Sequence, residues 1–295
     1  MNGNPTPVMI DTDPGVDDFI AILMAIRSSE LDLLGLTTVG GNTSLENATL
    51  NALRTVEIEG RPDIPVAIGA AAGRTRPFEY ADHFHGETGL AMALPAPGIE
   101  PLEIPAVAWL AQTLAQHSNT ITLLPVGPVT NIARLIEEHP EAANQIDRMI
   151  VMGGAVDCPG NATDYAEFNT WNDPEAAEIV FGAGINTTLI GLDVCNQVAF
   201  TREIISDGAG PGRLMMDAWF AEHPDSEEFH LCDPLAVAVA IDPTLVRTES
   251  ISVAVDTSGG PERGNTMRGG DGPPIDVALE VDMERAVRLI SGLAL

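Results

Sequence analysis

The chain has 295 residues, 45% of them hydrophobic, which is enough to bury a sizeable core in a single domain spanning residues 1–295. Its formal net charge of −29 argues against a nucleic-acid or anionic-membrane partner, because both bind through basic patches. The sequence shows no apolar run of membrane-spanning length, no secretory signal and no metal-type pairing of its three cysteines, so we expect a cytoplasmic protein with reduced thiols.

Short apolar runs alternate with helix-length segments along most of the chain. The expected strands are 8–10, 31–42, 64–70, 120–131, 148–154 and 187–193, and the expected helices are 19–26, 45–59, 107–116, 132–138 and 173–181. This alternation predicts an α/β fold with a mainly parallel central sheet, helices on both faces and right-handed crossovers, in an open, Rossmann-like arrangement. The Gly/Pro-rich stretch 258–274 predicts a surface excursion or hairpin.

Polar loops follow several of the expected strands. Residues 11–18, 40–42, 127–131 and 153–154 each stand at or directly after the end of an apolar run. In a parallel sheet, ligands bind beyond the carboxyl ends of the strands. The sequence therefore predicts that four separate loops converge on one site.

Four aspartates, Asp11, Asp13, Asp17 and Asp18, crowd the first of these loops. Carboxylates at this density repel one another and resist burial unless a cation holds them. An EF-hand is excluded, because the acid, glycine and glutamate that its loop needs at the fifth, sixth and twelfth positions are missing when counted from Asp11.

Three roles remain open for these aspartates. Asp13 and Asp18 could hold a hard divalent cation of the Ca²⁺ class through carboxylate oxygens. Asp11 and Asp13 also match the start of an aspartyl-nucleophile phosphatase, although that class normally needs a lysine and all 14 basic residues here are arginine. In a purely structural role, the aspartates would cap a helix that begins near Phe19.

Six segments resemble, in the expected order, sequence blocks of the nucleoside hydrolases, which cleave the N-glycosidic bond of ribonucleosides to ribose and free base. They are IDTDPGVDD at 10–18, VGGN at 39–42, HGETG at 85–89, LLPVGPVTNIA at 123–133, VMGGAVDCPGNATDYAEFNTWNDPEAA at 151–177 and CDPLAVA at 232–238. One aspartate motif alone would be moderately specific, whereas the ordered set makes the resemblance strong. It implies the nucleoside hydrolase fold and a small-molecule ribonucleoside as the substrate.

By position, the resemblance implies a Ca²⁺ site made of Asp13, Asp18, Asp233 and the backbone carbonyl of Val126. Asp13 would also accept a proton from the calcium-bound water. The family commonly has threonine where Val126 stands, but a carbonyl ligand does not depend on its side chain.

The resemblance also implies a ribose site. The residues implied are Asp17, Asn42 and Asn169 for the 2′- and 3′-hydroxyls, Asn161 and Glu167 for the 5′-hydroxyl, and Met152 beneath the sugar. Carboxylate and amide oxygens would stabilise the positive charge that builds on the ribose as the bond breaks. Without the resemblance, Asn42 and Asn161 could equally be turn residues beside glycine.

The group that protonates the leaving base is where the sequence departs from the family pattern. Many members have a histidine immediately before the last calcium-binding aspartate, where this chain has Cys232. A thiol, with a reference pKa of about 8.5, is a different acid from an imidazole. Cys232 and His230 are therefore both candidate proton donors, His85 is a candidate ligand contact, and Trp219 or Phe229 could stack on the base.

The sequence thus predicts a calcium-dependent hydrolase of purine or pyrimidine nucleoside salvage. Family resemblance implies a homodimer or homotetramer. The alternative is a nucleoside- or ribose-binding protein that keeps the metal site but has little turnover because of the change at Cys232.

Overall fold

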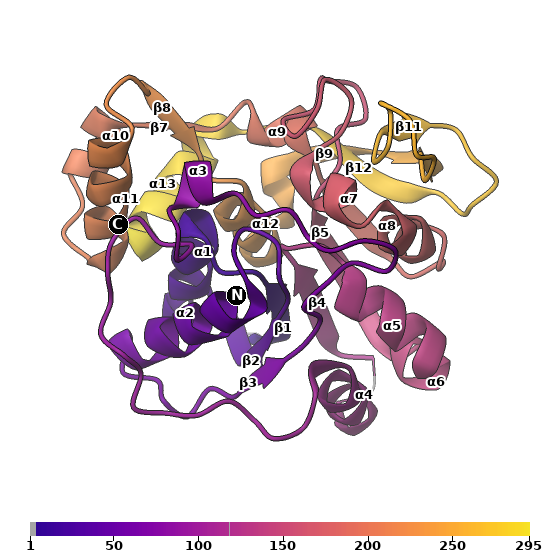
Figure 1. The fold of residues 1–295 in the computed structure, drawn as a ribbon, viewed down its shortest axis with the longest axis horizontal. Helices are drawn as coiled ribbons and strands as arrows, with labels where there is room; N and C mark the ends of the chain where they lie inside the picture. Colours follow the sequence, from indigo (N-terminus) through magenta and orange to yellow (C-terminus); the bar gives the residue numbers. More distant parts are fainter. Residues whose placement is uncertain (1–3, 118) are drawn as a thin grey trace.

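A mainly parallel sheet of eight strands forms the centre of the molecule, whose computed structural model describes residues 4–117 and 119–295 (Figure 1). The strands run in the order β3-β2-β1-β4-β5-β6-β12-β9, and only β9 pairs antiparallel to its neighbour within this sheet. Their bounds are β1 (Thr6–Thr12), β2 (Leu31–Thr38), β3 (Val66–Ile68), β4 (Ile121–Pro125), β5 (Ile146–Met152), β6 (Thr187–Ile190), β9 (Val246–Ile251) and β12 (Ile275–Val281). The predicted parallel α/β fold is confirmed.

Helices cover both faces of the sheet, because alternate strand residues point to opposite sides. On β1, Val8 and Ile10 pack into one hydrophobic core, whereas Met9 between them packs into the other. The first face carries α1 (Val16–Arg27), α2 (Leu45–Ile58), α11 (Pro211–Glu222), α12 (Cys232–Ile241) and α13 (Met283–Ala294), and the second carries α4 (Ala106–Gln116), α5 (Thr130–Glu138), α6 (Pro140–Ala143) and α8 (Pro174–Phe181).

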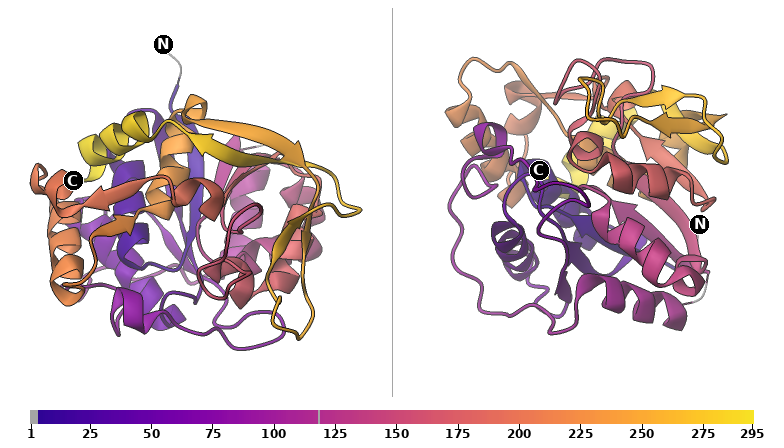
Figure 2. Two further views of the ribbon diagram at one scale, coloured as in Figure 1. Left: turned by 90° about the horizontal axis from the view of Figure 1, so that it is seen from above. Right: turned by 45° about the vertical axis from the view of Figure 1, so that its right-hand side comes forward.

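Short elements complete the fold around one end of the sheet. They are α3 (Asp82–His85), α7 (Phe168–Asn172), α9 (Leu192–Cys195), α10 (Arg202–Ser206) and the 3₁₀ turn η1 (Pro243–Leu245). Two antiparallel hairpins pair β7 (Ala199–Thr201) with β8 (Glu228–His230), and β10 (Val253–Val255) with β11 (Thr266–Arg268). Part of the stretch 258–274 is therefore a hairpin, as predicted, and Figure 2 shows it near the edge formed by β9 and β12.

The first helix begins earlier than the sequence predicts. It starts at Val16 rather than at Phe19, so Asp17 and Asp18 lie in its first turn and not in a loop. The side chain of Asp18 causes this shift, because its Oδ2 accepts the backbone N–H of Gly15, 2.9 Å away, and so caps the helix start. The two carboxylates are consequently fixed on a rigid element.

Two other expectations also need correction. The segment predicted as a strand over 120–131 ends at Pro125, and helix α5 begins within it at Thr130. Trp219, expected as a possible stacking residue for the base, lies on helix α11 and is buried in the core. Among the described residues, no helix has the length and apolar character needed to cross a membrane.

Most arginines are engaged in ion pairs with carboxylates. Those paired are Arg27, Arg61, Arg74, Arg213, Arg247, Arg263, Arg268, Arg285 and Arg288. Many of these pairs are solvent-exposed, so each contributes little to stability. Their effect is on the distribution of charge, because the acids that they neutralise do not include Asp11, Asp13, Asp17 or Asp18.

The strand order reverses between β1 and β4. From β1 the chain builds β2 and β3 on one side, and then crosses to β4 and continues with β5 and β6 on the other. In open parallel sheets, a crevice forms beyond the carboxyl ends of the two strands at such a point. The polar loops that follow β1 and β4 therefore meet there.

Candidate active site

A cavity of about 540 Å³ lies at this reversal point, within the range of small-molecule sites. It is lined by most of the side chains that the sequence singled out: Asp17, Asn42, His85, Val126, Met152, Asn161, Glu167, Asn169, His230, Cys232 and Asp233. Asp13 and Asp18 lie beneath this lining and are fully buried. The predicted convergence of separate loops on one site is confirmed.

Asp13 is held in a tight backbone cradle. Its Oδ2 accepts the backbone N–H of Asn42 at 2.6 Å, whereas its buried Oδ1 has no hydrogen-bond partner among the described residues. A Cβ atom at Gly41 would lie 2.1 Å from Oδ2, and one at Gly127 would lie 2.5 Å from Oδ1. Both positions must be glycine if the carboxylate is to stay where it is.

Asp18 accepts hydrogen bonds from its own loop and from the next one. Its donors are Thr12 Oγ1 at 2.5 Å, the backbone N–H of Gly15 at 2.9 Å and Asn42 Nδ2 at 2.9 Å. Asn42 therefore contacts Asp13 through its backbone and Asp18 through its side chain, which explains why an asparagine follows the two glycines of VGGN.

Asp17 and Asp233 complete a group of four buried carboxylates. Oxygen atoms of Asp17, Asp18 and Asp233 all lie within 4.8 Å of one another, a spacing that a single cation could bridge. The structure thus brings Asp17, expected to bind only the sugar, into the same group as the expected ligands Asp18 and Asp233. The side chain of Asp13 stands at the edge of this group.

The electrostatics of the group favour a cation. Burial and the charge of Asp18 raise the pKa of Asp17 to about 8, and burial with repulsion from Asp18 also raises the pKa of Asp13. The pKa of Asp233 is raised by burial and by the other three aspartates. All the candidate ligand atoms of this group are carboxylate oxygens, which suit a hard divalent cation. Among the described residues, Asp13 Oδ1 and Asp17 Oδ1 are buried and have no hydrogen-bond partner.

Asp11 supports the site from behind and does not line the cavity. It is fully buried, and its Oδ1 accepts hydrogen bonds from Thr37 Oγ1 at 2.5 Å and from Asn131 Nδ2 at 2.8 Å. A phosphatase nucleophile must reach its substrate, so this position does not support the aspartyl-phosphatase alternative.

The polar residues of the opposite wall are partly occupied by their own loops. Asn169 Nδ2 donates to the Val126 carbonyl at 3.0 Å and to Met152 Sδ at 3.4 Å. The Glu167 carboxylate caps α7 by accepting the backbone N–H groups of Asn169 and Thr170. These bonds fix the orientation of Asn169 and Glu167 toward the cavity.

Asn161 is the most exposed of the expected ligands. Its Oδ1 accepts the backbone N–H of Phe168 at 2.9 Å, which ties the long loop after β5 to the start of α7. Burial raises the pKa of Glu167, although its hydrogen bonds from Asn169, Thr170 and Gly154 oppose that shift.

The two candidate proton donors, Cys232 and His230, and the candidate ligand contact His85 also line the cavity. His85 is buried, and its Nδ1 accepts the backbone N–H of Val16 at 3.1 Å. Burial lowers the pKa of His85 to about 3, so its ring is neutral with the proton on Nε2. The Cys232 thiol donates to the carbonyl of His230 at 3.6 Å, and its contact with Cys195, together with burial, raises its pKa.

Of the two histidine rings, that of His230 is the more exposed. Its Nε2 lies 3.3 Å from Glu228 Oε1, and its Nδ1 is buried with no hydrogen-bond partner in the part of the chain that the structure describes. Sequence reasoning missed Glu228, because only the pairing of β8 with β7 places residues two apart, Glu228 and His230, on one side of a strand.

The aromatic residues expected to meet the base lie deeper than predicted. Trp219 and Phe229 are each only 1% exposed, and Trp219 does not belong to the described cavity lining. Phe84, which the sequence did not single out, lines the cavity with 37% of its surface exposed. No sequence signal separates a core aromatic from a cavity aromatic here.

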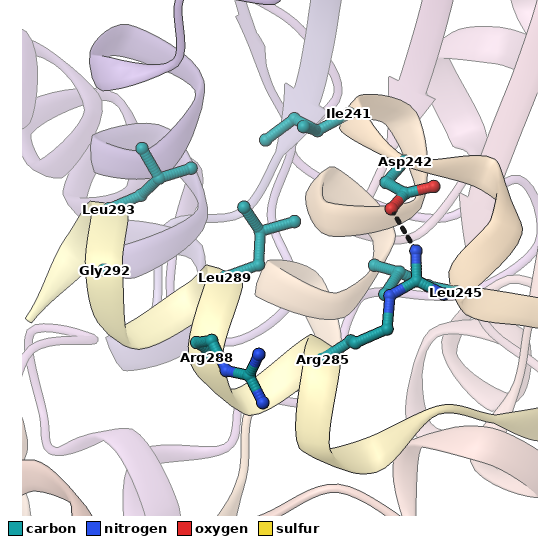
Figure 3. A pocket seen from close by; sticks show the side chains of 8 residues that line it. All are labelled: Ile241, Asp242, Leu245, Arg285, Arg288, Leu289, Gly292 and Leu293. Atoms are coloured by element: carbon teal, nitrogen blue, oxygen red, sulfur yellow. Dashed lines mark hydrogen bonds and ion pairs between the residues drawn. The ribbon is translucent and has the colours of Figure 1, made fainter.

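A second hollow, of about 450 Å³, lies between α12, η1 and α13 (Figure 3). Its walls are mainly apolar, and its arginines are already paired: Arg285 with Asp242 and Arg288 with Glu284. The acid-lined cavity, by contrast, combines unpartnered carboxylates with groups that can carry a proton.

Comparison with known proteins agrees with this geometry. The family model described as inosine-uridine preferring nucleoside hydrolase matches residues 8–288. A pyrimidine-specific ribonucleoside hydrolase RihA of Photobacterium profundum is 40% identical over 88% of both chains, and one of Escherichia coli is 37% identical over 97% of both.

Solved structures resemble the whole chain as well. A plant nucleoside hydrolase, PpNRh1, superposes with a TM-score of 0.93 and 33% identity, covering 98% of this chain and 99% of its own. A purine-preferring ribonucleoside hydrolase from Gardnerella vaginalis has a TM-score of 0.90 and 33% identity over the same shares of the two chains.

Proposed function

Because this chain belongs to the inosine-uridine preferring nucleoside hydrolase family and is a ribonucleoside hydrolase, we propose that it works with a calcium ion in its aspartate group. The observation that carries this proposal is the group itself, formed by Asp13, Asp17, Asp18 and Asp233 with two buried oxygens unpartnered. Calcium accepts six to eight oxygen ligands in flexible geometry, which suits carboxylates from several elements better than the strict octahedron of Mg²⁺ does.

The ion and the carboxylates have separate tasks in this scheme. A bound calcium ion would supply Lewis-acid activation of the attacking water. Asp13, whose Oδ1 is unpartnered, accepts the proton of that water as the bond to the base breaks. Asp13, Asp18 and Asp233 are the proposed carboxylate ligands. The backbone carbonyl of Val126, which accepts Asn169 Nδ2 at 3.0 Å, is the fourth proposed ligand.

The sugar is proposed to lie between the acidic group and the loop after β5. Asp17, Asn42 and Asn169 bind the 2′- and 3′-hydroxyls, and their negative and partial charges stabilise the positive ribose of the transition state. Asn161 and Glu167 bind the 5′-hydroxyl, and Met152 packs beneath the ring. Fixing the sugar in this way places its anomeric carbon next to the water.

His230 is the proposed donor of the proton to the leaving base. His85 is neutral and holds its remaining proton on Nε2. The Cys232 thiol donates a hydrogen bond to the His230 carbonyl and contacts the Cys195 thiol. His85 and Cys232 therefore position the base, while His230, paired with Glu228, carries the proton.

Replacement of His230 by alanine is expected to slow hydrolysis of uridine and inosine by about 100-fold, the scale of a lost general acid. Hydrolysis of p-nitrophenyl riboside should change little, because nitrophenolate leaves without protonation. Steady-state kinetics on both substrates measure the difference, with His139→Ala as a control remote from the cavity. Equal losses on both substrates, or a selective loss in Cys232→Ala instead, would contradict the assignment.

Replacement of Glu167 by glutamine is expected to lower the free energy of unfolding by about 1–3 kcal/mol. Both of its oxygens accept backbone N–H groups, and a glutamine would turn an N–H donor toward one of them. The KM for inosine should rise while that for 5′-deoxyinosine stays the same. An equal rise in KM for inosine and for 5′-deoxyinosine would mean that Glu167 only caps α7.

The comparisons also bear on which nucleosides the enzyme prefers. The pyrimidine-specific relatives support uridine and cytidine as preferred substrates, and incubation with uridine, cytidine, inosine, adenosine and guanosine, assayed for reducing sugar, tests this. Absence of ribose from all five reactions with calcium present would contradict the calcium-dependent scheme.

We also propose that the chain is a single domain and forms a cytoplasmic homodimer or homotetramer. Light scattering of the purified protein tests the oligomeric state.

A further inference from the structure

Four successive backbone N–H groups in the loop after β5 donate to side-chain oxygens. Gly154 donates to Glu167 Oε2 at 3.0 Å, and Ala155 donates to Thr266 Oγ1 at 2.7 Å. The next two N–H groups donate to the two carboxylate oxygens of Asp193 on α9, at 2.9 and 2.7 Å. Because these acceptors come from distant parts of the chain, tertiary contacts set the conformation of this loop.

Thr266 contacts this loop from outside the cavity. It is the first residue of β11 and does not belong to the described cavity lining. Its side chain is buried, at 1% exposure, whereas the next residue, Met267, is 37% exposed. A buried backbone N–H needs an acceptor, so the Thr266 hydroxyl fixes where Ala155 lies. Since Ala155 directly follows Gly154, the same contact holds the N–H that binds Glu167.

The hairpin that carries Thr266 is seated on two helices. Gly264, in its turn, has a φ of +84°, and a Cβ atom there would lie 2.5 Å from the Cα of Trp171 on α7. Arg263 reaches α8, where its two terminal nitrogens each lie 2.8 Å from an oxygen of Glu175 in a mostly buried pair. Figure 1 shows β11 on the same side of the molecule as α7 and α8. The hairpin is therefore fixed relative to α7.

Glu167 lies between the two segments that the hairpin contacts. Its Oε1 accepts the backbone N–H of Asn169 at the start of α7, and its Oε2 accepts that of Gly154 in the loop after β5. The hairpin contacts α7 through Gly264 and the loop through Thr266. Both parts of the backbone that orient the carboxylate are thus held by one hairpin.

We propose that Thr266 is a positioning residue, which aims the carboxylate of Glu167 at the 5′-hydroxyl of the substrate. It acts through the N–H groups of Ala155 and Gly154. This inference rests on the proposed function, which places the 5′-hydroxyl at Glu167. A carboxylate held by fixed N–H groups binds the sugar without having to reorient. Thr266 therefore strengthens the preference for ribosides that carry a 5′-hydroxyl, although it does not touch them.

The test compares two inhibitors, an iminoribitol and its 5-deoxy analogue, whose protonated ring nitrogen mimics the positive ribose of the transition state. Calorimetry with calcium present gives the dissociation constant of each, and the ratio of the 5-deoxy value to the other reports the bond to the 5′-hydroxyl. Thr266→Val keeps the shape of the side chain but removes the acceptor oxygen. It should lower this ratio by about 2- to 12-fold, the effect of one neutral hydrogen bond.

Two variants serve as references for this loss. Thr266→Ser keeps the oxygen and should retain the wild-type ratio. Thr248→Val, which changes an exposed threonine on β9, is the matched control and should leave the ratio unchanged. If Thr266→Val does not fold, Thr266→Cys, whose sulfur is a weak acceptor, gives the same comparison.

A purely structural role for Thr266 predicts a different result. Thr266→Val would then melt at a lower temperature but weaken both inhibitors equally, or neither, and this outcome would overturn the proposal. A ratio near one in the wild-type protein would refute the 5′-hydroxyl site at Glu167, and the proposal with it. Binding does not need turnover, so a wild-type protein that prefers the iminoribitol over its 5-deoxy analogue but releases no ribose would refute the proposed function alone.

Discussion

Replacement of Asp13 by asparagine is expected to lower kcat for ribonucleosides by about 10⁴-fold. The substitution keeps the size of the side chain, and its Oδ1 can still accept the backbone N–H of Asn42 after rotation of the amide. It removes the carboxylate that would accept a proton from water, and it weakens the acidic group by one charge. Single-turnover kinetics with saturating uridine and calcium measure the loss.

The matched control is Asp32→Asn, which removes one exposed carboxylate from β2, away from the cavity. It should leave kcat unchanged. Thermal unfolding of both variants separates a catalytic loss from a folding defect. A near-normal rate in Asp13→Asn would show that Asp13 neither binds the ion nor accepts the proton.

Removal of divalent metal is expected to abolish hydrolysis and to destabilise the protein most at alkaline pH. Burial raises the pKa of Asp11 to about 7, and burial with the charge of Asp18 raises that of Asp17 to about 8. Both values lie above the roughly 3.9 of an unfolded chain, so the metal-free folded state binds more protons than the unfolded state. Its stability should therefore fall as pH rises from about 4 to 8.

Calcium should reverse this trend, because it binds the ionised carboxylates and competes with protons. At 100 times its dissociation constant, a ligand of the folded state adds about 2.7 kcal/mol. The measurement is the melting temperature at pH 8 and at pH 5.5, in chelator and in calcium, with NaCl at equal ionic strength as the control for screening. A calcium effect of equal size at both pH values would contradict a site made of these aspartates.

Hydrophobic runs and turn residues were sufficient to predict the parallel half of the fold. Val8–Ile10 lies within β1, the helix expected over 45–59 matches α2, and the polar loops meet where the rule for parallel sheets places them. The start of α1 was predicted three residues late. Asp17 and Asp18 look like loop residues in the sequence, but the bond from Gly15 to Asp18 makes them the first turn of the helix.

Tertiary contacts determine the parts that sequence patterns missed. Strand β9 carries exposed polar residues, and its pairing with β12 stabilises it, so it has no continuous apolar run to reveal it. Asp233 lies far from Asp13 in the chain. Before the structure, only the family resemblance predicted that the two residues belong to one site. The positions of Phe84 and Glu228 in the cavity lining depend on how α3 and β8 fold over the cavity, which no local pattern specifies.

The placement of the arginines has a consequence for which metabolites can enter. The paired arginines neutralise acids elsewhere, and no arginine belongs to the described lining of the acidic cavity. A chain with a net charge of −29 therefore presents a strongly negative entrance. We therefore expect neutral nucleosides to enter more readily than nucleotides, whose phosphate charges this field repels. Salt shortens the reach of this field to about 10 Å at 0.1 M, so the exclusion of nucleotides weakens as ionic strength rises.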